Sequence, residues 1–265
     1  MIIIKRELAF SRTSFIIWGT ILFFITLMFF GSFAAIEIDE NYLKIMEQMP
    51  EALKAAFMID ILNYADLHGF FAGNSYPYLM ILVGIYTAIL AATMFSKEED
   101  KRTAEFLYTK PVTRGNIFSQ KLISVLLNVI GMNLILLAGI FLTLVFIIAK
   151  DFNPTIFLTL VLGMFLACLT IAGMGLLISN FTSSEKLGLT LGISFVMISY
   201  VLNIMSGIVD AFSFLKYASF FYYLDPASIV VSEQIPWGKY GILLSVFMIT
   251  TYLAYIRFLK KDISL

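Results

Sequence analysis

The charged side chains that could do chemistry in this 265-residue chain gather in one stretch, from Ser96 to Lys121. It carries six basic and four acidic residues, and a long apolar run lies on either side of it. Charges at this density suit ion pairing with a partner surface, or they can simply fix the topology of a membrane protein. We expect the stretch to connect two membrane helices in the cytoplasm and to transmit the protein's work.

Other residue types that carry chemistry are scarce. The chain has one histidine, His68, and one cysteine, Cys168, which leaves no basis for a histidine-rich metal site or an intrachain disulfide. The phosphate-binding pattern G-x-x-x-x-G-K-[ST] does not occur, so we expect no ATP hydrolysis by this chain. Asp225 and Glu233 fall in a segment rich in helix breakers, which favours a structural role. We therefore predict a protein that is not an enzyme and binds no metal or cofactor itself.

The composition identifies an integral membrane protein. The chain is 60% hydrophobic and 14% charged, whereas a soluble domain is about 45–50% apolar and about 25% charged. A soluble protein of this composition would expose apolar patches that aggregate. The formal net charge is zero, which gives no sign of a nucleic-acid partner.

Six apolar runs are long enough to cross a bilayer, which requires about 20 helical residues. The predicted spans are residues 15–36, 76–95, 122–149, 155–179, 187–209 and 240–258. The first run could mimic a signal peptide, but its 22 residues exceed the about 7–15 of a signal core, so we expect a retained helix. The fold class is thus an all-α polytopic membrane protein with a single transmembrane domain over residues 1–265.

The segments between the spans add detail to this topology. Residues 1–14 are typical either of a short interfacial helix or of a basic terminus that only sets topology. The predicted outer loop 37–75 has a helical pattern after Pro50, which indicates an amphipathic helix on the outer surface. Residues 210–238, the second outer loop, are aromatic and interrupted by prolines, so we expect short re-entrant or interfacial helices there.

The distribution of charge predicts the orientation. With both termini and the loop 96–121 on one side, that side holds 13 of the 18 basic residues and 7 of the 18 acidic ones. The opposite side holds the remaining 5 basic and 11 acidic residues. Because basic loops stay inside, we expect both termini and this loop to be cytoplasmic.

Polar residues within the spans are uncharged, which argues against a proton-driven transporter. Tyr200 and Asn203 are candidates to line a translocation path, although hydrogen bonding between helices would also explain them. Ser184, Gly188 and Gly192 give the fifth span a small-residue face that allows close helix packing, within the chain or across a dimer.

Between Glu98 and Arg114 the residue types follow a distinctive order, with a pair of glutamates, then T-A-E-F-L, then K-P-V-T-R. This order resembles the first cytoplasmic loop of ABC-2 type transporter permeases, the membrane subunits of one class of ATP-binding-cassette exporters. That loop typically carries an E-E pair followed by G-T-x-E-x-L-L-x-x-P-V-x-R. Arg102 stands where the family has glycine, a departure that affects the local turn. Residues 49–57 and the six spans extend the resemblance over nearly the whole chain.

The residues themselves favour a short helix over 98–109, with an acidic start that suits the positive helix end. Pro111 would stop this helix. The resemblance implies that the helix couples the chain to a separate ATPase subunit. Residues expected to take part are Glu98, Glu99, Thr103, Glu105, Phe106, Leu107, Pro111 and Arg114.

The resemblance also implies the assembly and its task. Two copies of an ABC ATPase subunit would bind ATP and Mg²⁺, and the permease would form a homodimer, or a heterodimer with a second permease, in a bacterial plasma membrane. A cavity rich in apolar and aromatic side chains suits an amphipathic peptide, such as a toxin or antimicrobial peptide, or a hydrophobic compound better than a free ion. Efflux of sodium or small drugs, a non-transporting sensor or accessory subunit, and a membrane enzyme remain as alternatives.

Overall fold

The computed structural model of the chain is a bundle of helices. It describes residues 2–35, 44–45, 48–50, 54, 59, 61–101, 112–148 and 152–261. Six helices in this part of the chain are long and apolar enough to cross a membrane, which confirms the predicted number of spans. Their backbone hydrogen bonds are internal, as a segment surrounded by lipid requires.

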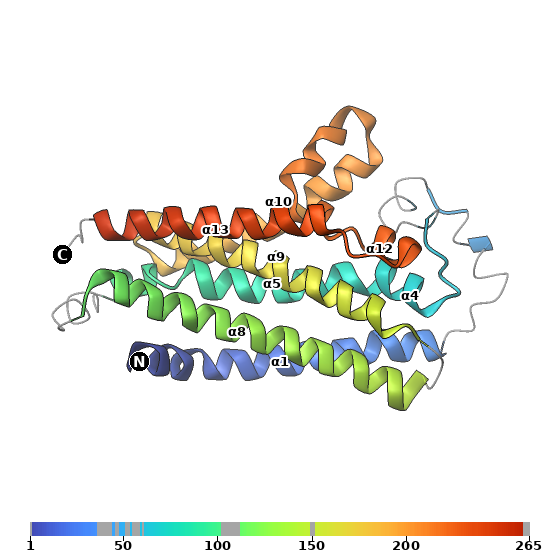
Figure 1. Cartoon of the computed structure of the whole chain (residues 1–265), viewed down its shortest axis with the longest axis horizontal. Coiled ribbons are helices and arrows are strands. Elements are labelled where there is room, and N and C mark those ends of the chain that lie inside the picture. The colour runs from blue at the N-terminus through green and yellow to red at the C-terminus, as the bar shows by residue number, and fades with distance from the viewer. Residues whose placement is uncertain are drawn as a thin grey trace.

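The six long helices lie side by side, and the two ends of the chain lie at the same end of the bundle, here called the terminal end (Figure 1). These helices are α1 (Ile2–Ala35), α5 (Tyr76–Ala92), α8 (Arg114–Thr143), α9 (Pro154–Phe181), α10 (Glu185–Ile208) and α13 (Trp237–Lys260). The shorter elements are α4 (Leu67–Phe70), η1 (Phe71–Ser75), α6 (Ser96–Asp100), η2 (Leu144–Ile148), η3 (Asp210–Ala218), α11 (Phe220–Leu224) and α12 (Pro226–Ser232).

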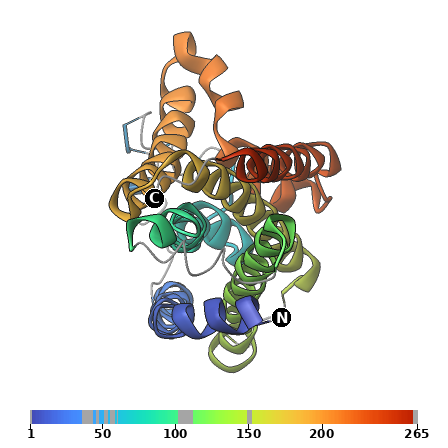
Figure 2. The same ribbon diagram turned by 90° about the vertical axis from the view of Figure 1, so that its left-hand side faces the viewer.

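Helix α9 occupies the centre of the bundle. It packs extensively against α5 and α13, and also against α8 and α10, as the end-on view in Figure 2 shows. Helix α1 lies at the edge, packed along α8 with only limited contact to α5. A narrow recess lined by apolar side chains lies between α1 and α5.

Several helices extend beyond the predicted spans. Residues 2–14 and residues 15–35 of the first span form one continuous helix, α1, because the charged residues near its start are compatible with helical backbone. Helix α8 begins at Arg114, eight residues before the predicted start, since the Thr113 side chain accepts a hydrogen bond from the Asn116 amide and caps the helix. The amphipathic helix expected after Pro50 lies mostly outside the described residues.

The small-residue face of α10 is used within the chain. A Cβ at Gly192 would lie 2.8 Å from the Cβ of Ala92 and 3.0 Å from the carbonyl oxygen of Ala88, both on α5. A Cβ at Gly188 would overlap the Ala92 carbonyl oxygen. Ser184 precedes the helix with extended backbone. The close approach that these residues permit is thus between α10 and α5.

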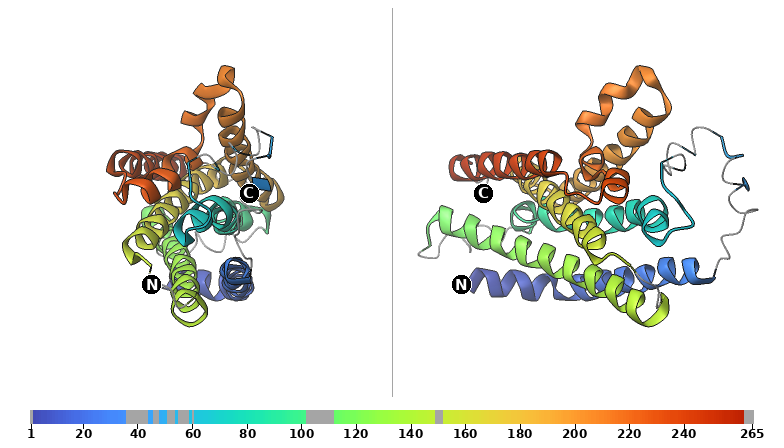
Figure 3. Two further views of the ribbon diagram at one scale, coloured as in Figure 1. Left: turned by 90° about the vertical axis from the view of Figure 1, so that its right-hand side faces the viewer. Right: turned by 45° about the vertical axis from the view of Figure 1, so that its right-hand side comes forward.

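Beyond its first turns, α10 tilts away from the bundle and forms a protruding hairpin with η3 (Figure 3). Ser219 closes the hairpin, because its Oγ donates to the Ser199 carbonyl oxygen at 2.7 Å. The Ser199 Oγ in turn accepts from the Phe220 amide at 3.0 Å. Residues 210–238 accordingly fold as three short helices, η3, α11 and α12, before α13 returns to the terminal end.

At the opposite end of the bundle, His68 ties the start of the second span to α9. Its Nδ1 lies 3.0 Å from an Asp66 carboxylate oxygen, and its Nε2 accepts a hydrogen bond from the Asn153 amide at 3.0 Å. Its ring also packs on Phe157, with centroids 5.1 Å apart. Between α11 and α12, Asp225 forms a 2.7 Å ion pair with Lys239 of α13. These groups hold the fold together.

The close packing of α10 on α5 predicts the effect of a single methyl group. We expect Gly192→Ala to lower the stability by about 1–3 kcal/mol, because the added Cβ overpacks the contact with Ala88 and Ala92. Gly241→Ala on α13 is the matched control, since a Cβ there meets nothing within 4 Å. Thermal unfolding of the two variants in detergent measures the difference, and equal midpoints would contradict this packing.

Candidate functional site

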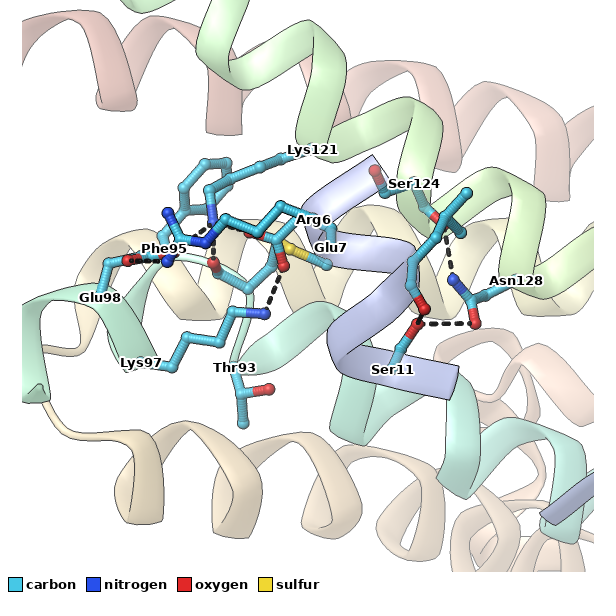
Figure 4. Close-up of polar contacts among 12 residues, drawn as sticks. Arg6, Glu7, Ser11, Thr93, Phe95, Lys97, Glu98, Lys121, Ser124 and Asn128 are labelled. Atoms are coloured by element: carbon cyan, nitrogen blue, oxygen red, sulfur yellow. Dashed lines mark hydrogen bonds and ion pairs between the residues drawn. The ribbon is translucent and has the colours of Figure 1, made fainter. Parts of the chain in front are cut away.

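Five charged side chains meet at the terminal end of the bundle and form what we call the charge cluster: Arg6, Glu7, Lys97, Glu98 and Lys121 (Figure 4). The two carboxylate oxygens of Glu7 lie 2.8 Å from the Lys121 ammonium and 2.6 Å from the Lys97 ammonium. Glu98 lies 3.2 Å from Lys121 and 3.3 Å from the Arg6 guanidinium. The cluster thus joins α1, α6 and α8.

The centre of the cluster is almost dry. The side chains of Lys121 and Glu7 are 1% and 3% exposed. Removing such charges from water costs several kcal/mol each, unless every polar atom finds a partner. Lys121 meets this condition, because its ammonium donates to Glu7, to Glu98 and to the Met94 carbonyl oxygen at 2.9 Å, one acceptor for each of its three N–H groups.

Lys97 is the second ammonium that faces Glu7. Burial lowers the pKa of the Lys97 ammonium below its ordinary value, and the nearby Glu7 carboxylate opposes this shift. Because the short 2.6 Å hydrogen bond joins two charged groups, it is among the stronger contacts in the cluster. The start of α1 is therefore held to α6 as well as to α8.

The break between α5 and α6 positions Lys97 and Glu98, and a serine on α9 stabilises that break. The buried Ser179 Oγ accepts hydrogen bonds from the amides of Phe95 and Ser96, at 2.7 and 3.0 Å. These amides lie where α5 has ended and α6 begins, so the helix itself leaves them without acceptors. Ser179 therefore fixes where the membrane helix stops and the charged segment starts.

A polar network inside the bundle continues the connection between the same helices. The Asn128 side chain on α8 accepts from the Tyr86 hydroxyl of α5 at 2.8 Å. It also accepts from the Ser11 hydroxyl of α1 at 3.3 Å (Figure 4). Its amide nitrogen donates to the Ser124 carbonyl oxygen at 2.8 Å. Because both contacts are buried, they favour one fixed arrangement of α1, α5 and α8.

The described members of the predicted coupling set contact other segments of the same chain. Glu98 belongs to the charge cluster. Glu99 forms an ion pair with Lys261, and Arg114 donates to the carbonyl oxygens of Leu259 and Lys261, so both hold the end of α13. The remaining predicted members lie outside the described residues: Thr103, Glu105, Phe106, Leu107 and Pro111.

The two residues suggested to line a path lie on α10. Tyr200 is half-buried and packs against Phe221 of α11, with ring centroids 5.2 Å apart. The backbone carbonyl of Asn203 accepts a hydrogen bond from Ser206. The structure does not bring either residue to the charge cluster, which lies at the terminal end.

Sequence reasoning missed five residues as parts of a site: Arg6, Glu7, Lys97, Lys121 and Ser179. A signal for Glu7 was present, because Ile3, Glu7 and Ser11 recur every four residues and so share one helix face. The Ile3 amide contacts Gln120 and Ser11 contacts Asn128, which makes this the face that meets α8. No local pattern marked Ser179, since its partners lie more than 80 residues away.

In the described part of the chain, six apolar helices with a buried charge cluster at one end define a multi-pass membrane protein. The chain belongs to the ABC-2 transporter family, because the family described as "ABC-2 family transporter protein" matches residues 1–263.

A curated relative was also found. Over 51 residues the chain is 45% identical to the uncharacterized membrane protein YdbK of Bacillus subtilis strain 168. This match covers 19% of the chain and 21% of YdbK, so it spans about a fifth of either protein.

The burial of the charge cluster predicts that the Glu7 carboxylate is essential for stability. We expect Glu7→Gln to lower the stability by about 3–5 kcal/mol, because two buried ammonium groups lose their shared counter-ion. The control is Arg6→Gln, which removes the half-exposed member of the cluster and should cost about 0–1 kcal/mol. Thermal unfolding in detergent separates the two, and a wild-type midpoint for Glu7→Gln would contradict the assigned role.

Proposed function

We propose that the chain is the transmembrane subunit of an ABC-2 exporter in a bacterial plasma membrane, driven by a separate ATPase at the terminal end of the bundle. The charge cluster is the observation that carries this proposal. It connects α6, which continues into the predicted coupling segment, with the first turns of α1 and α8. A force applied to α6 would therefore reach two membrane helices directly.

The orientation in this proposal rests on the excess of basic residues at the terminal end. Both termini and residues 96–121 would lie in the cytoplasm, where ATP is available, and residues 37–75 would lie outside. Two ATPase copies would bind ATP and Mg²⁺, and a second permease, identical or homologous, would complete the assembly.

The mechanism follows from the cost of separating the buried charges. Leaving one partner of such a pair alone costs about 3–5 kcal/mol. Movement of α6 by the ATPase would therefore carry Glu98, Lys121 and Glu7 together and shift α1 and α8 as one unit. The contacts of Glu99 and Arg114 extend the same connection to α13. The chain itself supplies the path and the transmission, while ATP supplies the energy in the partner.

The lining between α1 and α5 supports an apolar or amphipathic cargo. In this conformation the recess there is closed to a water-sized group, and the described side chains that line it are apolar or aromatic: Trp18, Ile21, Leu22, Leu82, Val83, Tyr86 and Met132. Free ions require charged or carbonyl-lined sites, whereas a peptide with an apolar face can pack against such a surface. We infer export of an amphipathic peptide, such as a toxin or antimicrobial peptide, or of a hydrophobic compound.

The test reconstitutes the permease with its ATPase and measures ATP turnover with and without cargo peptide. We expect the double variant Glu99→Lys/Arg114→Glu to insert normally but to lose cargo-stimulated turnover by about tenfold, within the 1–3 kcal/mol of typical coupling energies. Both residues hold the end of α13 beside the predicted coupling segment. Lys260→Glu, an exposed charge reversal in the last turn of α13, is the matched control.

The outcomes separate the candidate functions. Normal transport by the double variant, with the ATPase bound at wild-type yield, contradicts coupling through this end. A wild-type complex that binds the ATPase but moves no cargo would indicate a sensor or accessory subunit. Activity of the chain without any ATPase would indicate an enzyme.

A further inference from the structure

A cavity of about 230 Å³ opens beside the charge cluster. It lies between the first turns of α1 and the segment around α6. The lining residues are Arg6, Glu7, Phe10, Lys97, Glu98 and Lys101. Its volume exceeds the about 30 Å³ of a water molecule several-fold, so it can hold a group the size of a phosphate.

The charges around this cavity do not balance. Among the described residues, Arg6, Lys97 and Lys121 form ion pairs with Glu7 and Glu98, and Lys101 forms a separate pair with Glu185. Within this described set, one positive charge is in excess. A phosphodiester carries a single negative charge and accepts hydrogen bonds from guanidinium and ammonium groups. It would neutralise the cavity without disturbing the existing pairs.

Donors for such an anion are available at the cavity mouth. The side chains of Arg6 and Lys101 are 48% and 49% exposed, so they can reach a ligand from solvent or membrane. Within the described part of the chain, the hydrogen bonds of Arg6 to Glu98 use one terminal nitrogen only. A guanidinium has five N–H groups on three nitrogens, which leaves two nitrogens for a further acceptor.

An apolar stripe on α1 leads away from this cavity. Its residues are Phe10, Ile17, Ile21, Phe24 and Met28, with exposed fractions between 43% and 73%. At 100° per residue these five positions and Arg6 fall within an arc of about 60°, so they share one face of the helix. The stripe begins one turn after Arg6 and passes the apolar recess beside Trp18 and Ile21. A cationic cavity at the end of an exposed apolar stripe matches a phospholipid in shape and polarity.

We propose that the cavity binds the phosphate of an anionic phospholipid, whose acyl chain lies along the α1 stripe. The lipid rather than a partner protein is indicated because the stripe continues from the cavity along the membrane-spanning part of α1. Phosphatidylglycerol fits better than phosphatidylcholine, since the choline cation would lie beside Arg6 and Lys101. This site depends only on insertion of the helix bundle in a membrane, and not on coupling to an ATPase.

The chain contains its own reporter for the test. It has two tryptophans; Trp18 lines the recess beside the stripe, and Trp237 starts α13, away from the terminal end. In a Trp237→Phe background, fluorescence therefore reports on Trp18 alone. The protein is placed in phosphatidylcholine vesicles that contain a small, equal fraction of brominated-chain phosphatidylglycerol or brominated-chain phosphatidylcholine. Quenching of Trp18 then measures how often each lipid occupies the stripe.

We expect brominated phosphatidylglycerol to be preferred about fivefold or more over brominated phosphatidylcholine, an effect of the size that one or two basic side chains give at a membrane surface. Arg6→Gln/Lys101→Gln should abolish this preference, because both donors at the mouth are lost. Lys260→Gln removes one exposed charge from α13 at the same end and should preserve it. Since both members of the double variant are half-exposed, the fold should persist, and thermal unfolding verifies this.

Three results would overturn the proposal. The first is equal quenching by the two lipids in the unaltered cavity, and the second is a preference that survives in the Arg6→Gln/Lys101→Gln variant. The third is loss of the preference on addition of inorganic phosphate, which would assign the cavity to a soluble anion. Absence of quenching by either lipid counts with the first result, because a second protein chain would then cover the stripe.

Discussion

The arrangement of this bundle at its terminal end depends on the ammonium of Lys121. It is buried, and it survives there because three acceptors from three segments surround it: Glu7, Glu98 and the Met94 carbonyl. Any displacement of α1 or α6 that removes one acceptor leaves a charge in a dry site, which is costly. Helices α1, α6 and α8 are thereby held in one register.

This constraint has a functional meaning in the proposed exporter. Such a permease would have to change shape, but not by gradual deformation, because the energy of ATP would then be lost. Buried ion pairs favour discrete arrangements, since intermediate geometries leave donors and acceptors unpaired. The hydrogen bonds of Asn128 with Tyr86 and Ser11 add a second fixed level deeper in the bundle. Because the charge cluster and the Asn128 hydrogen bonds both join α1 to α8, we expect these two helices to move as a unit.

Much of the architecture could be predicted from the sequence, because hydrophobic length alone identifies spans such as residues 155–179, and α9 covers that range closely. Boundaries were less accurate where polar residues continue a helix, as in the first turns of α1. The start of α8 was readable in principle, since Thr113 is a good capping residue.

The contacts of the charge cluster could not be predicted in the same way. Glu7 and Lys121 are separated by 114 residues, and their pairing follows from how α1 packs on α8. Nothing local distinguishes a glutamate that will be buried from one that will face water. The loop pattern between Glu98 and Arg114 did identify the family, which a profile over residues 1–263 shows. It could not tell that Glu98 would be engaged with α1 and α8.

The serine at the break between α5 and α6 has a consequence for exchanging segments between permeases. Because Ser179 on α9 supplies the acceptor for the Phe95 and Ser96 amides, the end of α5 is set by a residue far away in the sequence. A relative that receives residues 96–101 of this chain would gain the charges. Without a counterpart of Ser179, it would not gain their placement. Segments of this kind are portable only together with the part of α9 that receives them, so the unit of exchange is a pair of helices.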